Sequence, residues 1–124
     1  MDTVSAACSG RARAKGLRLV VDRCNVSVAA RRELLELMGR PLAKHTACVY
    51  FNVPREVCEE RIRARVDHPT IRSVHRGMKA IASFAKTLEP PEPSEGFGRV
   101  YEVQTFSDVD RLLASWGCTA LSKL

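Results

Sequence analysis

The chain has 124 residues, a formal net charge of +6 at pH 7 and a hydrophobic content of 45%. This length suits one domain or part of one, and the hydrophobic content is too high for disorder to be the default state. No apolar run approaches the roughly 18 residues that a membrane-spanning helix needs, so we expect no membrane association. The basic charge favours polyanionic partners such as nucleic acids or nucleotides, with a solvated basic surface as the alternative.

The five cysteines are odd in number, widely spaced and free of any C-x-x-C pair. This pattern argues against a disulfide framework or a zinc site, and the three histidines add no metal-ligand spacing. Three of the five cysteines lie in apolar segments, as expected of small core residues. We therefore expect no metal site and an intracellular location, nuclear or cytoplasmic. The Ala-, Arg- and Ser-rich start leaves a weak organellar targeting signal as an alternative.

The first third of the chain predicts an extension, a strand and a helix. Residues 1–16 are expected to form an N-terminal extension, either a short helix or disordered. LRLVVD, residues 17–22, is a short run of strand-forming residues that ends in an acid, as expected of a buried parallel strand. Ser27 suits the N-cap of an amphipathic helix over about 28–38, which Gly39 ends.

The middle of the chain predicts a strand followed by two helices. TACVYFNV, residues 46–53, has the composition of a second buried strand. Pro54 suits the first turn of a helix that runs to about residue 65 or 66 and stops before Pro69. The segment 73–88 has the clearest helical periodicity of the chain.

The last part of the chain predicts a connector, a strand and a helix. EPPEPSEG, residues 89–96, is a proline-rich connector that we expect not to be helical. RVYEV, residues 99–103, is the third expected strand. Ser107 suits the N-cap of a final helix that Gly117 closes, and residues 118–124 form a tail.

These elements follow the order β-α-β-α-α-β-α. Strands that alternate with helices indicate an α/β fold in which helices flank a parallel sheet, here of about three strands. We therefore expect residues 17–117 to form one α/β domain.

The end of the first expected strand is a candidate phosphate site. In open α/β sheets, ligands bind at the carboxyl ends of the strands, which is where Asp22 and Asn25 lie. A carboxylate at this place can hold Mg²⁺ through water or order the phosphates. The alternative is a carboxylate that only caps the following turn.

Two pairs of arginines are candidate phosphate ligands. Arg31 and Arg32 lie on the helix after Asp22, where one guanidinium can reach a phosphate; the alternative is a solvated helix face with pairing to Glu36. Arg61 and Arg65 share a helix face just before a helix break, as on a lid that closes over a polyphosphate. Their alternative is an exposed helix with salt bridges to the neighbouring Glu59 and Glu60.

Three ordered segments resemble a known family: VVDRCN before the Arg-rich helix, RARVDHPTI, and SFAKTLEPPEPSEGF before the closing strand. Together they resemble the C-terminal portion of P-loop polynucleotide-kinase-like proteins. That family includes the kinase domain of polynucleotide 5′-kinase/3′-phosphatase and the kinase-like domain of some aprataxin-like proteins. The resemblance spans about residues 17–117 and implies a partial P-loop kinase-like fold of three layers.

The resemblance also implies an activity and its site residues. The complete family domain uses ATP and Mg²⁺ to phosphorylate the 5′-hydroxyl of DNA or RNA, a transferase reaction of DNA repair. Asp22 and Asn25 match the family's strand-end acid and amide, which shape the acceptor and phosphate site. The resemblance assigns a catalytic role to Asp22 and substrate binding to Asn25. Arg65 best matches the catalytic lid arginine on the nucleotide phosphates, with Arg61 as a second.

The helix arginine near the strand-end motif is matched by Arg31 or Arg32, which the resemblance assigns to the substrate. Two family features have no counterpart in the 124 residues: a G-x-x-x-x-G-K-S/T phosphate loop and the acidic general base. The implied activity therefore belongs to the complete domain. The alternatives are a non-catalytic remnant that binds nucleic acid or protein, and a scaffold whose sheet is completed by a strand from a partner or a second copy.

Overall fold

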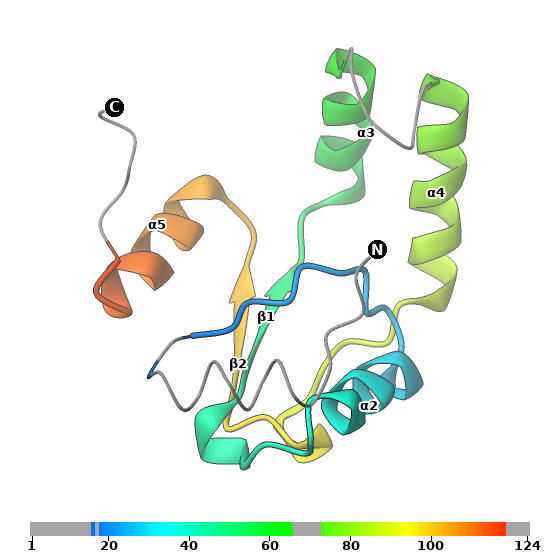
Figure 1. Ribbon diagram of the computed structural model, residues 1–124. Helices are drawn as coiled ribbons and strands as arrows, with labels where there is room; N and C mark the ends of the chain where they lie inside the picture. The colour runs from blue at the N-terminus through cyan, green and yellow to red at the C-terminus, as the bar shows by residue number, and fades with distance from the viewer. Residues whose placement is uncertain (1–15, 17, 66–72, 119–124) are drawn as a thin grey trace. The chain divides into compact units, whose positions relative to one another are not determined.

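The computed structural model describes residue 16 and residues 18–65 and 73–118 (Figure 1). In chain order these residues form α2 (Val28–Leu37), η1 (Ala43–His45), β1 (Ala47–Phe51), α3 (Arg55–Ala64), α4 (Val74–Thr87), η2 (Pro93–Glu95), β2 (Arg99–Val103) and α5 (Phe106–Ser115). The predicted α/β class is confirmed, with four α-helices and a two-stranded parallel sheet among the described residues. The short helix expected within residues 1–15 lies outside the described residues.

The sheet pairs β1 directly with β2, and both strands run in the same direction (Figure 1). The strands expected over 46–53 and 99–103 are confirmed. The strand expected over 17–22 is wrong for its described part, because residues 18–22 have no regular structure and the Val20 side chain is 82% exposed. A strand needs a neighbour for its backbone N–H and C=O groups, and the described sheet gives this segment none.

The helices follow their local signals closely. The Ser27 hydroxyl accepts a hydrogen bond from the Ala30 N–H at 3.1 Å, so the predicted N-cap of α2 is confirmed. Gly39, just past the end of α2, has a φ of 80°, the left-handed conformation that glycine adopts without strain. The helices expected near 54–65 and 73–88 are confirmed as α3 and α4. α3 ends at Ala64 with Arg65 as its C-cap, close to the end expected near residue 65 or 66, and Pro69 itself lies outside the described residues.

Two expectations are corrected, one about the connector 89–96 and one about the start of α5. The connector 89–96 contains one 3₁₀ turn, η2, in which Pro93 occupies the first position, where a missing N–H costs nothing. The N-cap of α5 is Thr105 rather than Ser107: its hydroxyl accepts from the Asp108 N–H at 3.1 Å, and the Asp108 carboxylate accepts from the Thr105 N–H at 3.1 Å. This reciprocal capping box fixes where α5 begins.

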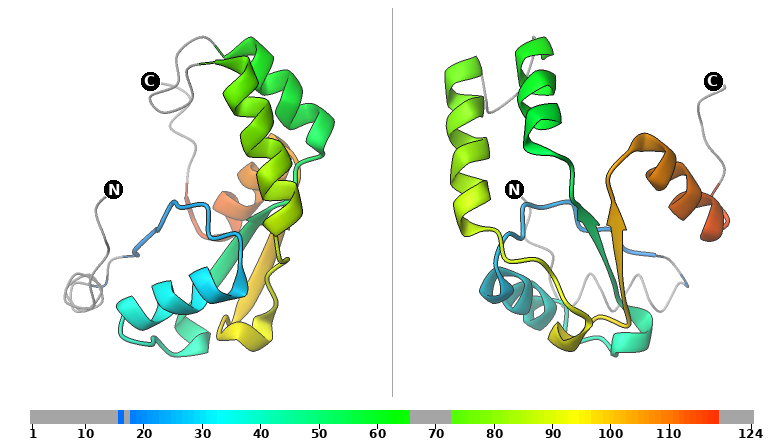
Figure 2. Two further views of the ribbon diagram at one scale, coloured as in Figure 1. Left: turned by 90° about the vertical axis from the view of Figure 1, so that its right-hand side faces the viewer. Right: turned by 180° about the vertical axis from the view of Figure 1, so that it is seen from behind.

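The chain divides into two compact units. The first comprises Met1–Cys48 and Phe84–Val100, and the second comprises Val49–Ser83 and Tyr101–Leu124. Among the described residues, the buried hydrophobic side chains are Phe97 in the first unit and Val103 in the second. Within the second unit, α3 and the part of α4 up to Ser83 lie side by side and run in opposite directions in each view (Figures 1 and 2).

No described helix combines the length and the apolar composition that crossing a lipid bilayer would require.

Candidate functional site

The turn over residues 22–25 carries the predicted acid and amide. The Asp22 side chain is exposed, and Asn25 is half-buried with a φ of 44°. Asparagine tolerates this left-handed backbone better than most residues, because its short polar side chain bonds locally. The side-chain oxygen Oδ1 of Asn25 is buried and accepts no hydrogen bond from the described chain. A buried oxygen without a donor is uncommon in folded proteins, so it marks this turn as a candidate binding position.

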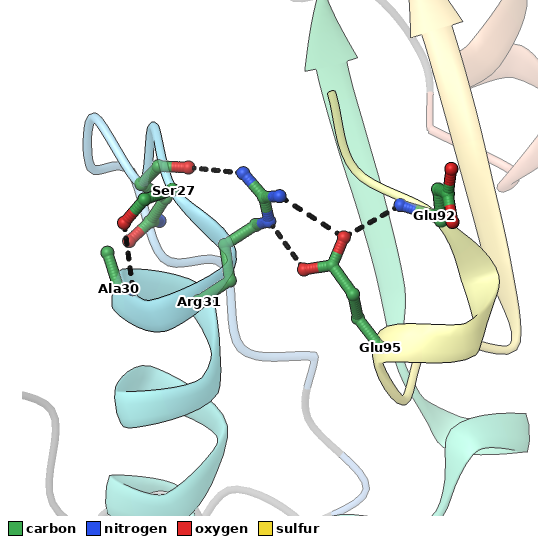
Figure 3. A network of polar contacts seen from close by, with 6 residues as sticks. Ser27, Ala30, Arg31, Glu92 and Glu95 are labelled. Carbon is green, nitrogen blue, oxygen red and sulfur yellow. Dashed lines mark hydrogen bonds and ion pairs between the residues drawn. The ribbon is translucent and has the colours of Figure 1, made fainter. Parts of the chain in front are cut away.

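Arg31 connects this turn to a distant segment of the first unit. Its side chain is 4% exposed, and its guanidinium lies between the 22–25 turn and η2 (Figure 3). Nε donates to Glu95 Oε1 at 2.8 Å, Nη2 donates to Glu95 Oε2 at 3.1 Å, and Nη1 donates to the Asn25 carbonyl oxygen at 2.9 Å. The solvated alternative for Arg31 is wrong, since the side chain points inward. Its predicted contact with a substrate phosphate stays a prediction, with three nitrogens already engaged by protein oxygens.

Glu95 is the residue that the sequence reasoning missed. It lies 64 positions from Arg31 and is only 10% exposed at its side chain. Its Oε2 also accepts a hydrogen bond from the Glu92 N–H at 2.8 Å, within the capping box of η2. The carboxylate is therefore held from two sides, by a backbone N–H and by a bidentate guanidinium.

The surroundings of Glu95 favour its ionised form. Burial alone raises the pKa of the carboxyl, but the hydrogen bonds from Arg31 and from the Glu92 N–H, with the charges of Arg31 and Arg32, outweigh it and lower the pKa. The nearby Cys48 thiol shows the opposite result: burial raises its pKa, and the lowering by Arg31 does not offset this. Cys48 is thus expected to stay a neutral thiol rather than a nucleophilic thiolate.

The lowered pKa of Glu95 predicts a pH dependence of stability. A carboxyl whose folded pKa is depressed stabilises the fold above its unfolded pKa of about 4.3 and loses this contribution as pH falls through the folded pKa. We expect the midpoint of urea unfolding to fall more steeply between about pH 5 and pH 2 in the wild type than in Glu95→Gln. Parallel pH profiles of the two proteins would contradict this.

Arg32 faces two hollows of the first unit. It is exposed, and it borders a cavity of about 700 Å³ whose other lining residues are Val28, Leu88, Glu89, Pro90, Glu92, Ser94 and Glu95. A second hollow of about 270 Å³ also includes Arg32, with Glu36 and Arg40. The larger cavity has one guanidinium and three carboxylates, so a polyphosphate placed there would meet net repulsion. The predicted substrate role of Arg32 stays a prediction.

The second unit carries the two arginines of the expected lid. Arg65 is the exposed C-cap of α3, and the guanidinium carbon of exposed Arg61 lies 4.9 Å from the ring centroid of Phe106. Glu59, an expected partner, pairs instead with Arg55 at 2.9 Å. Within the described ranges, neither Arg61 nor Arg65 forms an ion pair. Both charges are therefore available to an anion, although their predicted roles stay predictions.

Metal binding by the described residues would depend on isolated carboxylates. In the described part of the chain, no group of three or more His, Cys, Asp or Glu side chains is placed to hold an ion. Mg²⁺ in phosphoryl-transfer sites is commonly held by one or two carboxylates together with the substrate phosphates. A single exposed carboxylate such as that of Asp22 is compatible with that manner of binding.

The sequence of the chain matches the model of a protein family described as an AAA domain, over residues 2–91. The chain belongs to this AAA domain family of P-loop NTPase-like kinases. The resemblance to P-loop kinases is thereby confirmed at the level of a nucleotide-binding, phosphotransfer-type fold. Members of this class generally use ATP and Mg²⁺.

The chain is also similar to the Arabidopsis thaliana protein named transcription factor bHLH140. The two are 28% identical over 96 residues, which cover 77% of this chain and 10% of that protein. The chain therefore spans about a tenth of the length of the curated relative that it matches.

Proposed function

We propose that this AAA domain chain takes part in ATP-dependent phosphorylation of a nucleic-acid 5′-hydroxyl, as a portion of a polynucleotide-kinase-like domain. The observation that carries the proposal is a pair of exposed arginines, Arg61 on α3 and Arg65 at its C-cap, which have no carboxylate partner among the described residues. Guanidinium groups free of carboxylates bind phosphate oxygens in pairs and stabilise the charge that develops in phosphoryl transfer.

The 22–25 turn supplies the acceptor side of this proposal. Asp22 offers an exposed carboxylate, and the buried Oδ1 of Asn25 is an acceptor without a donor in the described chain. A hydroxyl group is both a donor and an acceptor, so either of these side-chain oxygens can accept its hydrogen. The net charge of +6 adds long-range attraction for a nucleic-acid backbone.

ATP and Mg²⁺ are the cofactors that the proposal requires. Arg61 and Arg65 are the described residues that would bind the nucleotide phosphates. Arg31 is engaged with Glu95, and Arg32 borders a cavity that is also lined by carboxylates. Within the first unit, the exposed carboxylate of Asp22 is the group that would hold Mg²⁺ through water. When bound, the metal neutralises charge on the phosphates.

Calorimetric titration of the full chain with Mg-ATP tests the proposal. Saturable binding is expected, and Arg65→Gln and Arg61→Gln are each expected to weaken it by roughly tenfold, the loss of about one charge-assisted hydrogen bond. Arg63→Gln is the matched control, since Arg63 is an exposed arginine of the same helix at a position that does not share their face. We expect its affinity to stay within about twofold of the wild type.

A second titration with a 5′-hydroxyl oligonucleotide tests the acceptor. We expect the oligonucleotide to bind in a manner that weakens with added salt and that depends on Asp22 and Asn25.

Two outcomes of these titrations would exclude the proposed roles. One is a loss of ATP affinity in Arg63→Gln equal to that in the other two variants, and the other is a folded chain that gives no heat with either ligand.

A further inference from the structure

Two hydrogen bonds hold the backbone that directly follows the Cα of Asn25, a residue with a left-handed φ of 44°. The Asn25 carbonyl oxygen accepts from Arg31 Nη1 at 2.9 Å, and the next carbonyl oxygen, that of Val26, accepts from the Glu89 N–H at 2.8 Å. Left-handed backbone is unfavourable for a residue other than glycine, and it persists where surrounding contacts determine it. These two hydrogen bonds therefore hold the C-terminal end of the 22–25 turn, at Asn25 and Val26.

The direction in which the Arg31 guanidinium points depends on Glu95. A free arginine samples many rotamers, whereas a carboxylate that binds Nε and Nη2 together sets the plane of the guanidinium. In that plane the remaining nitrogen, Nη1, points at the Asn25 carbonyl oxygen, to which it donates at 2.9 Å. Glu95 is itself held by the Glu92 N–H, so the chain of contacts ends on a backbone group of η2.

We propose that Glu95 is a positioning residue: through Arg31 it holds the 22–25 turn in the conformation that presents Asp22 and Asn25 to the acceptor. The link to the acceptor rests on the function proposed above. Arg31 is thereby reassigned from a substrate ligand to a positioning residue. Its guanidinium is engaged by Glu95 and by the turn, and its 4% exposed side chain leaves little access for a phosphate.

Amide hydrogen exchange of the full chain, measured by NMR, tests the positioning directly. The Glu89 N–H reports on the turn, because its acceptor is the Val26 carbonyl beside Asn25. The Asn52 N–H, which donates to the Val103 carbonyl at 2.9 Å in the second unit, is the internal control. We expect Glu95→Gln to accelerate exchange at Glu89 by roughly tenfold and to change exchange at Asn52 by less than about twofold.

A double variant separates positioning from general stability. In Arg31→Met with Glu95→Leu, apolar side chains replace both buried charges, which commonly preserves the fold while removing the hydrogen bond to Asn25. Exchange at Glu89 is again expected to rise by roughly tenfold while the unfolding midpoint stays near that of the wild type. Unchanged exchange at Glu89, or equal acceleration at Glu89 and Asn52, would overturn the proposal.

Binding of a 5′-hydroxyl oligonucleotide to the same variants tests the link to function. If the wild type binds and the double variant binds at least about tenfold more weakly at equal stability, the turn positions the acceptor. Equal affinity of the two proteins would overturn that role. If the wild type binds no oligonucleotide, the proposed function fails, and the exchange experiment still decides whether Glu95 positions the turn.

Discussion

Arg31→Ala and Glu95→Ala are each expected to lower the free energy of unfolding by roughly 3–5 kcal/mol. The two side chains are 4% and 10% exposed, so removal of either leaves the other as a buried charge without its partner. Arg31→Ala also removes the donor to the Asn25 carbonyl, and Glu95→Ala removes the acceptor for the Glu92 N–H. Urea unfolding followed by circular dichroism measures the loss.

The surface pair Arg40–Glu36 is the matched control, because its side chains are 79% and 51% exposed. Glu36→Ala is expected to cost less than about 1 kcal/mol, since water screens exposed pairs. The double variant Arg31→Met with Glu95→Leu is expected to recover most of the stability lost in the single variants. If Arg31→Ala and Glu95→Ala lost no more free energy of unfolding than Glu36→Ala, the buried pair would contribute no more than a surface pair.

The sequence predicts the elements whose signals are local. Ser27 lies directly before an amphipathic segment, and a hydroxyl at that position caps α2 whatever lies elsewhere in the chain. The segment 17–22 shows the limit of such signals. Its composition suits a strand, but pairing depends on a neighbour, and the described sheet pairs β1 with β2 only. The N-cap of α5 was misplaced by two residues because Thr105 and Ser107 both carry a capping hydroxyl.

The candidate site is less accessible to sequence reasoning than the fold. Periodicity places Arg61 and Arg65 on one face of α3, but it cannot show that Phe106, from another helix, lies against Arg61. Glu95 lies in a proline-rich segment that predicts only a connector, and no local pattern relates it to Arg31, 64 positions away. The direction of Arg31 likewise follows from a tertiary contact, since a helix arginine is more often solvated.

Gly98→Ala is expected to destabilise the chain by about 3 kcal/mol, at the upper end of the range for overpacked sites. A Cβ at position 98 would overlap the Ala43 carbonyl oxygen and would lie 3.0 Å from the Ala43 carbonyl carbon and 3.2 Å from the Lys44 Cα. All three atoms belong to the backbone of η1, so no side-chain rotation relieves the clash. The Gly98 N–H donates to the Thr46 carbonyl at 2.9 Å, and separation of the segments would also break this hydrogen bond.

Gly117→Ala is the matched control for this substitution. Gly117 has a φ of 74°, but a Cβ there would meet no atom within 4 Å, so its cost is only the left-handed backbone, about 1 kcal/mol. Urea unfolding of the two variants separates the causes: a larger loss in Gly98→Ala assigns the glycine at 98 to the close approach of η1. A larger loss in Gly117→Ala would mean that η1 moves aside readily. The start of β2, which directly follows Gly98, would then not depend on this contact.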